Sequence, residues 1–126
     1  MAELKIFYRD KEKQDRIKVG RSVNILNSLD KKDIIWIDLL DVSDKTEGVL
    51  EDFLKIDIQE DEEMEEIEMS SRYIQTDDSI VANSNFLRDN FEVEPVNFIL
   101  KNSILVTTRD VELASFNETV KKMLMN

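Results

Sequence analysis

Ile34–Leu40 (IIWIDLL) is the stretch of sequence that decides the fold. It is almost continuously apolar and begins with β-branched residues, which favour an extended strand. A strand with one face in water would alternate apolar and polar residues, because successive side chains point to opposite faces. This segment carries apolar side chains in both directions, as buried strands of α/β proteins do. We therefore expect Ile34–Leu40 to be a strand that is covered on both faces.

The segments on either side of this strand have their own signals. Leu4–Arg9 and Arg16–Val19 flank a polar turn and predict a β-hairpin. Ser22–Leu29 has a rough helical face of apolar residues behind a capping serine, so it predicts a short helix. After the strand, Ser43 is positioned to cap a helix whose apolar residues recur at helical spacing. The residues expected on its buried face are Val49, Leu50, Phe53 and Leu54.

The second half of the chain predicts strands followed by one helix. The predicted strands are Arg72–Gln75, Ser79–Leu87, Val93–Leu100 and Ile104–Thr108, and the closing helix is Ala114–Met125. Pro95 suits an edge strand or the start of a strand, because proline cannot donate to the ladder. The order ββαβααββββα mixes local hairpins with one buried strand between helices. It favours the α/β class, a layered structure with a mixed sheet, in a single domain.

Composition excludes several classes of function. The chain has 126 residues, no cysteine and no histidine, and a net charge of −11. Thiol chemistry, disulfides and the commonest general base are therefore absent. The acidic balance disfavours nucleic acid and anionic lipid. No apolar stretch is long enough for a membrane span and no signal peptide opens the chain, so we expect a soluble, intracellular-type polypeptide.

Most of the negative charge lies in one segment, Asp57–Glu68 (DIQEDEEMEEIE), which carries eight carboxylates and no basic group. Met64 and Ile67 recur at helical spacing within it, so we expect a surface helix over about Gln59–Met69. Its acidic residues face one another at i,i+4, which costs about 0.2–0.5 kcal/mol per pair in an isolated helix. A bound hard cation such as Mg²⁺ or Ca²⁺ would relieve that repulsion. A solvated acidic surface helix is the alternative.

Catalysis is not expected. Serines have no histidine to activate them, and no glycine-rich phosphate loop exists. The carboxylate pairs Asp38/Asp41 and Asp77/Asp78 could do acid–base work, but a strand end and a turn explain them better. Trp36 is expected in the core. Several methionines are expected to fill core gaps, namely Met64, Met69, Met123 and Met125.

Five segments stand in a characteristic order along nearly the whole chain. They are Trp36–Asp41 (WIDLLD), Phe53–Ile58 (FLKIDI), Glu62–Tyr73 (EEMEEIEMSSRY), Glu94–Leu100 (EPVNFIL) and Leu105–Arg109 (LVTTR). Together they resemble the cytoplasmic N-terminal domain of the CorA family of magnesium and divalent-cation transporters. The resemblance implies a mixed sheet between two helical layers, a three-layer αβα arrangement. It also implies that residues 1–126 are a soluble fragment, with the family's long helix, transmembrane segments and Gly-Met-Asn signature beyond it.

The resemblance also implies a regulatory cation site and an assembly. Family members are homopentamers in the membrane, and divalent cations bound between neighbouring cytoplasmic domains favour the closed pore. One half of that site is an acidic pair on a helix, which Glu62 and Glu63 match. The family's best-known pattern has Glu-Asp there, and it commonly has a proline where this chain has Val42. The expected ion is Mg²⁺, with Co²⁺, Ni²⁺ or Zn²⁺ possible as in relatives.

Two hypotheses of different classes follow. The first is a non-enzymatic, Mg²⁺-sensing regulatory domain at the cytoplasmic face of the cell membrane, part of a CorA-like channel for magnesium uptake. The second is a stand-alone acidic protein-interaction module whose acidic helix engages a basic partner. Residues after Asn126 in the native gene would distinguish the two. By itself the domain is expected to be a monomer or a weak oligomer, because like charges repel.

Overall fold

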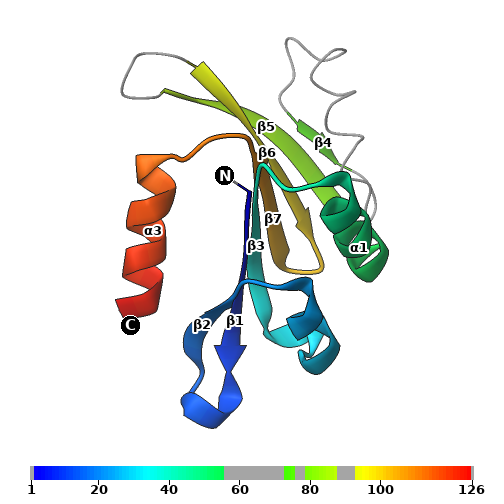
Figure 1. The fold of residues 1–126 in the computed structure, drawn as a ribbon, viewed down its shortest axis with the longest axis vertical. Coiled ribbons are helices and arrows are strands. Elements are labelled where there is room, and N and C mark those ends of the chain that lie inside the picture. Colours follow the sequence, from blue (N-terminus) through cyan, green and yellow to red (C-terminus); the bar gives the residue numbers. More distant parts are fainter. Residues whose placement is uncertain (1, 56–72, 76–78, 88–92, 126) are drawn as a thin grey trace.

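The computed structural model describes residues 2–55, 73–75, 79–87 and 93–125. In these ranges seven strands form one mixed sheet in the order β2-β1-β3-β7-β6-β5-β4 (Figure 1). The strands are β1 (Glu3–Asp10), β2 (Arg16–Gly20), β3 (Ile34–Leu40), β4 (Tyr73–Gln75), β5 (Ser79–Leu87), β6 (Val93–Lys101) and β7 (Ile104–Arg109). All neighbouring strands pair antiparallel except β3 and β7, which are parallel. The predicted α/β class and mixed sheet are confirmed.

Capping residues flank the three 3₁₀ helices and the first α-helix. They are the 3₁₀ helices η1 (Lys11–Lys13), η2 (Val23–Ser28) and η3 (Lys31–Asp33) and the α-helices α1 (Asp44–Leu54) and α3 (Ala114–Met125). The Ser43 hydroxyl accepts a hydrogen bond from the Thr46 amide at 3.3 Å, and α1 ends at Lys55 in the left-handed conformation. Ser22 caps η2 as expected, but this helix is of the 3₁₀ type.

The parallel pair joins two halves of the chain that fold locally. β1 and β2 form one hairpin, and β4 to β7 form an antiparallel meander. β3 bridges them, with Trp36 opposite Leu105 and Leu40 opposite Arg109. The predicted hairpin of Leu4–Arg9 and Arg16–Val19 is thus confirmed, and the buried strand lies inside the sheet between β1 and β7.

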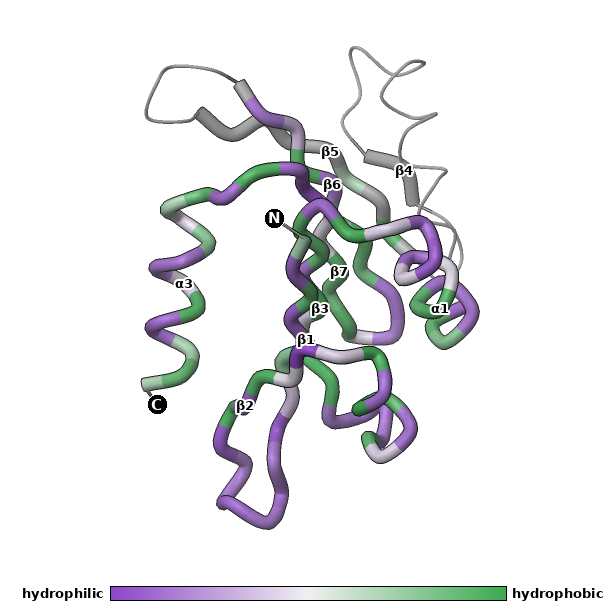
Figure 2. The backbone as a smooth tube through the Cα atoms, in the orientation of Figure 1, coloured by the Kyte–Doolittle hydropathy of each residue, from purple (hydrophilic) through white to green (hydrophobic). Residues whose placement is uncertain are grey.

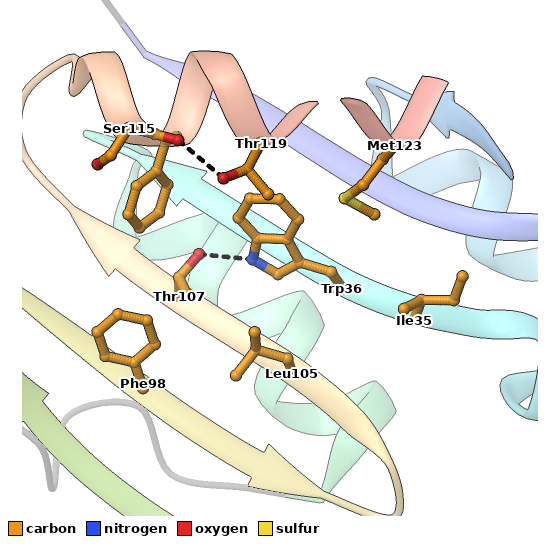
Figure 3. A pocket seen from close by; sticks show the side chains of 9 residues that line it. Ile35, Trp36, Phe98, Leu105, Thr107, Ser115, Thr119 and Met123 are labelled. Atoms are coloured by element: carbon orange, nitrogen blue, oxygen red, sulfur yellow. Dashed lines mark hydrogen bonds between the residues drawn. The ribbon is translucent and has the colours of Figure 1, made fainter. Parts of the chain in front are cut away.

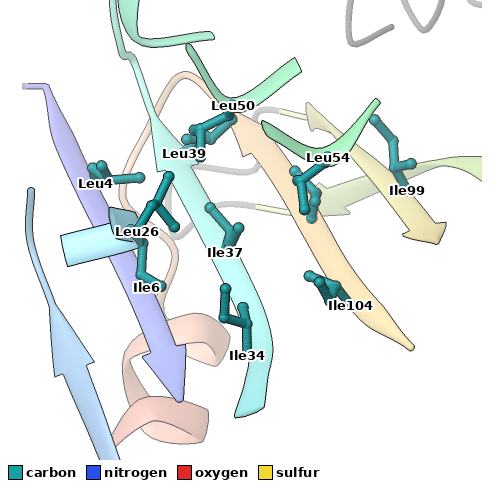
Figure 4. Packing of buried hydrophobic residues seen from close by; sticks show 11 residues of the cluster. Leu4, Ile6, Leu26, Ile34, Ile37, Leu39, Leu50, Leu54, Ile99 and Ile104 are labelled. Carbon is teal, nitrogen blue, oxygen red and sulfur yellow. The ribbon is translucent and has the colours of Figure 1, made fainter. Parts of the chain in front are cut away.

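Helices pack against both faces of the sheet. On one face, Leu26 of η2 and Leu50 and Leu54 of α1 pack in a cluster with strand residues (Figure 4). Its strand residues are Leu4, Ile6, Ile34, Ile37, Leu39, Ile99, Ile104 and Val106. On the other face, Phe116 of α3 packs with Phe7 and Trp36. Figure 1 accordingly shows α1 and α3 on opposite sides of β3. The prediction that Ile34–Leu40 is covered on both faces is confirmed.

Two further predictions concern Pro95 and the acidic helix. Pro95 lies near the start of β6, where the strand pairs with β5, and the pairing with β7 begins only at Asn97. The proline therefore avoids the part of β6 that has a ladder on both sides. The expected acidic helix, Gln59–Met69, lies outside the described residues. In the described ranges no helix is both long and apolar enough to span a membrane.

The two glycines, which have different surroundings, provide a matched test of this fold. A Cβ atom on Gly48, within α1, would have no atom within 4 Å, whereas on Gly20 it would lie 2.7 Å from Cδ1 of Ile25. Gly48→Ala should raise the free energy of unfolding by about 0.5–1 kcal/mol, because alanine loses less backbone entropy in a helix. Gly20→Ala should lower it by up to about 1 kcal/mol, because the end of the Ile25 side chain must move to make room. Urea denaturation measures the free energy of unfolding of each variant. Changes of the same sign in the two variants would contradict the packing described.

Candidate functional site

The carboxylates singled out from the sequence fall in two groups. Glu62 and Glu63, the expected cation ligands, and the turn residues Asp77 and Asp78 lie outside the described residues. In the described part of the chain, no cluster of three or more acidic side chains is arranged to hold a metal ion. The other two candidates, Asp38 and Asp41, are described, and Asp38 lies at the centre of a buried network of hydrogen bonds.

Asp38 is buried at the middle of β3 and accepts hydrogen bonds from two residues of β7. Its Oδ1 accepts from the Thr107 hydroxyl at 2.8 Å and from Nε of Arg109 at 3.2 Å, and its Oδ2 accepts from Nη2 of Arg109 at 2.7 Å. The parallel register creates this arrangement, because it places Thr107 directly opposite Asp38. The two-pronged contact of guanidinium and carboxylate is the geometry that arginine favours.

The network continues from this ion pair to α3. Nε1 of Trp36 donates to the Thr107 hydroxyl oxygen at 2.9 Å, so this hydroxyl both accepts and donates. Nη1 of Arg109 donates to the Val111 carbonyl at 2.8 Å, and its Cζ lies 4.5 Å from the centre of the Phe116 ring. Asp38 and Arg109 are each only 1% exposed, and charged side chains that lie this deep must be paired. Each is the partner of the other.

The network of Asp38, Thr107 and Arg109, which we call the clamp, holds β3 to β7 and offers no reactive group. The Asp38 carboxylate is occupied by three donors, and the guanidinium is shared among a carboxylate, a carbonyl and an aromatic face. Asp41 does not share this environment, since its side chain is exposed and its backbone amide donates to the Arg109 carbonyl at 2.8 Å. The pairing of Asp38 with Asp41 considered from the sequence is therefore not formed. Asp38 thus has a structural role, but it lies buried within β3 and not at the strand end that the sequence analysis assigned to it.

An apolar cavity of about 400 Å³ lies beside the clamp, between α3 and the sheet (Figure 3). Trp36, buried and stacked on Phe7 at 4.8 Å between ring centres, forms part of its wall, so its expected place in the core is confirmed. The Thr119 hydroxyl donates to the Ser115 carbonyl and is already satisfied.

The methionines were expected to fill gaps in the core. Half-buried Met123 lines the cavity, but Met125 is 83% exposed, so the expected role is wrong for Met125. Met64 and Met69 lie outside the described residues.

Reasoning from the sequence missed the partners of Asp38. One signal was present: a single acidic residue in an otherwise apolar buried strand requires a cation nearby. Arg109 directly follows the predicted strand Ile104–Thr108, but the sequence did not show which strand lies beside β3. The pairing of β3 with β7, about 70 residues apart, supplies that information, as the separation of the bonded residues shows.

The clamp predicts strong coupling between two buried residues. Arg109→Met or Asp38→Leu alone should cost about 3–5 kcal/mol of unfolding free energy, because each leaves an uncompensated buried charge. The double variant should lose much less than the sum of the two single losses. As a control, Glu118→Gln breaks the exposed 3.9 Å pair with Lys121 and should cost less than about 0.5 kcal/mol. Additive losses in a double-mutant cycle would disprove the coupling.

No protein-family model matches the chain. Two proteins named magnesium transport protein CorA are similar in sequence. The one from Wolinella succinogenes is 35% identical over an alignment of 99 residues that covers 72% of this chain and 31% of that protein. The one from Haemophilus ducreyi is 32% identical over an alignment of 95 residues that covers 71% of this chain and 30% of that protein.

Solved structures share the fold. The full-length CmaX protein aligns with a TM-score of 0.73 at 9% identity, covering 98% of this chain and 39% of that one. The ZntB cytoplasmic domain from Vibrio parahaemolyticus aligns with a TM-score of 0.55 at 14% identity, covering 70% of this chain and 38% of that one. The chain spans about a third of the length of the curated relatives it matches. It is, by sequence, a relative of the CorA magnesium transport proteins and corresponds to a part of them.

Proposed function

We propose that this chain is the cytoplasmic, Mg²⁺-sensing regulatory domain of a CorA-like divalent-cation channel that mediates magnesium uptake. In this proposal the domain is a single three-layer αβα unit at the inner face of the cell membrane. It works within a homopentamer and catalyses no reaction. The similarity to two proteins named magnesium transport protein CorA is the observation that carries the proposal.

The chemistry of the acidic run supports a sensor of hard cations. Its donor set is made of carboxylates alone, in a chain that has no histidine or cysteine. Mg²⁺ prefers oxygen ligands and keeps several of its waters, so one or two carboxylates suffice for a weak site. We assign this role to Glu62 and Glu63, as half of a site between subunits. Their matched position in the family pattern supports this assignment.

The chain on both sides of the acidic run Asp57–Glu68 belongs to regular elements of the fold. α1 is anchored to the sheet by buried Leu50 and Leu54 and ends one residue before Lys55. The run begins two residues after Lys55, and the chain re-enters the sheet at Tyr73 in β4. Both chain ends of the segment are therefore held by the sheet and its covering helix. A cation bound there can act on the orientation of neighbouring subunits.

The proposed mechanism is a shift between two states of the assembly. At low Mg²⁺ the carboxylates of adjacent subunits repel one another, and at higher Mg²⁺ the ion bridges them. The ion shifts the equilibrium toward the closed channel by the difference between its affinities for the two states. Weak binding suits this role, because a sensor must release its ion when the concentration falls.

Thermal melting of the 126-residue chain tests the cation site. A site with a Kd of about 10⁻⁴–10⁻³ M stabilises a protein by roughly 1–2 kcal/mol at about 5 mM Mg²⁺, and half a site gives less. We expect Mg²⁺ to raise the Tm slightly more than NaCl at the same ionic strength. Identical melting curves in the two salts would argue against a specific site in this chain.

A pair of double variants separates the acidic pair from general charge. Glu62→Ala with Glu63→Ala should abolish the extra stabilisation by Mg²⁺ while leaving the chain folded, because it removes the assigned ligands. Glu12→Ala with Glu118→Ala removes the same charge from exposed positions elsewhere and should leave the Mg²⁺ effect unchanged. In a full-length channel that carries this domain, only the first pair should weaken inhibition of the current by Mg²⁺. Equal effects of the two pairs would refute the assignment.

A further inference from the structure

A second cavity, of about 290 Å³, lies at the end of the sheet where β3 begins. Arg9, Lys31 and Lys32 line it together with the polar residues Asn102 and Ser103, and buried Ile34 contributes an apolar wall. Three cationic side chains and no carboxylate thus line a concave site in a chain whose net charge is −11.

The sheet topology explains why these residues meet. Lys31 and Lys32 belong to η3, which leads directly into β3 at Ile34. On one side of β3, Tyr8 pairs with Ile34, so Arg9 continues β1 past the start of β3. On the other side, β7 runs parallel to β3, so the β6–β7 turn with Asn102 and Ser103 lies at the same end. Both central residues of this turn have positive φ, 52° and 68°, as a tight two-residue hairpin requires.

The cations at this cavity are not neutralised by the acids nearby. In the described part of the chain, Arg9 and Lys32 make no ion pair, and the Lys31 ammonium lies 4.9 Å from the centre of the Phe53 ring. The three acids next to these cations in sequence have other partners. Asp10 pairs with Lys18 at 3.2 Å and Asp33 pairs with Lys11 at 3.4 Å. Asp30 accepts a hydrogen bond from the Lys32 amide at 3.0 Å. The cations therefore outnumber the acids here. Figure 2 shows that the neighbouring tip of the β1–β2 hairpin is hydrophilic.

We infer that this cavity binds a phosphate group, as a phosphate monoester or a diphosphate. Guanidinium and ammonium groups that converge on one space match the charge of phosphate, and arginine also matches its geometry. An amide and a hydroxyl supply further hydrogen-bond partners for its oxygens. This inference is independent of the proposed cation site, because it uses none of the residues of the acidic run.

Two sources supply this chemistry: a soluble phosphate compound, or the headgroup of a lipid at a membrane surface. Inorganic pyrophosphate represents the first. Vesicles of phosphatidylcholine with phosphatidic acid represent the second, with vesicles of phosphatidylcholine alone as the reference. The net charge of −11 repels both probes, so binding to either requires a local positive site.

The test is a titration of the 126-residue chain, followed through its backbone amide resonances, at constant ionic strength with chloride as the competing anion. We expect pyrophosphate or the phosphatidic acid vesicles to shift or broaden the resonances of Arg9, Lys31, Lys32, Asn102 and Ser103. Lys31→Gln with Lys32→Gln should raise the Kd about tenfold or more, because it removes two of the three cations that line the cavity.

The matched control is Lys45→Gln with Lys121→Gln, which removes two exposed lysines from α1 and α3. It should leave the Kd unchanged. A response to pyrophosphate alone identifies a soluble phosphate compound, and a response to the phosphatidic acid vesicles alone identifies a lipid headgroup. Equal weakening by the two double variants, or no response to either probe, would overturn the inference.

Discussion

The parallel alignment of β3 with β7, locked by the buried ion pair of Asp38 and Arg109, is the constraint on which the rest of the structure depends. Every other strand pairing is antiparallel and joins strands within one half of the described chain or β3 to β1. Only β3 with β7 joins the two halves. A slip of one residue would move Thr107 and Arg109 to the opposite face of the sheet and leave Asp38 without its partners. The ion pair therefore specifies the register.

The same pair connects the sheet to the helix that covers it. Arg109 reaches the Val111 carbonyl and the ring of Phe116, so the start of α3 is fixed relative to β7. The opposite face is covered by α1, which leads toward the acidic run. The buried charges of Asp38 and Arg109 thus stabilise the fold, and ligands can reach the charged side chains at the surface. In our account, one of these ligands is a divalent cation and the other is a phosphate group.

Local features of the fold were predictable from the sequence because local physics creates them. The hairpins, the caps Ser22 and Ser43 and the buried strand follow from turn chemistry, side-chain hydrogen bonds and hydrophobic pattern. The partner of Asp38 and the basic cavity could not be predicted, because both depend on which strand lies beside β3. The exposure of Met125 depends on where the buried face of α3 ends, and the helical period alone does not determine that point. Glu62 and Glu63 lie outside the described residues, so their assignment depends on the family pattern and on charge.

The most direct test of the central claim is to map a paramagnetic cation on the chain. Mn²⁺ binds the same oxygen ligands as Mg²⁺ and broadens the resonances of amides close to it. At low Mn²⁺ our account predicts broadening that is concentrated on the acidic run Asp57–Glu68, strongest near Glu62 and Glu63, and reversed by excess Mg²⁺. Broadening that is spread evenly over exposed carboxylates such as Glu12, Asp44 and Asp52, or that Mg²⁺ does not reverse, would contradict it.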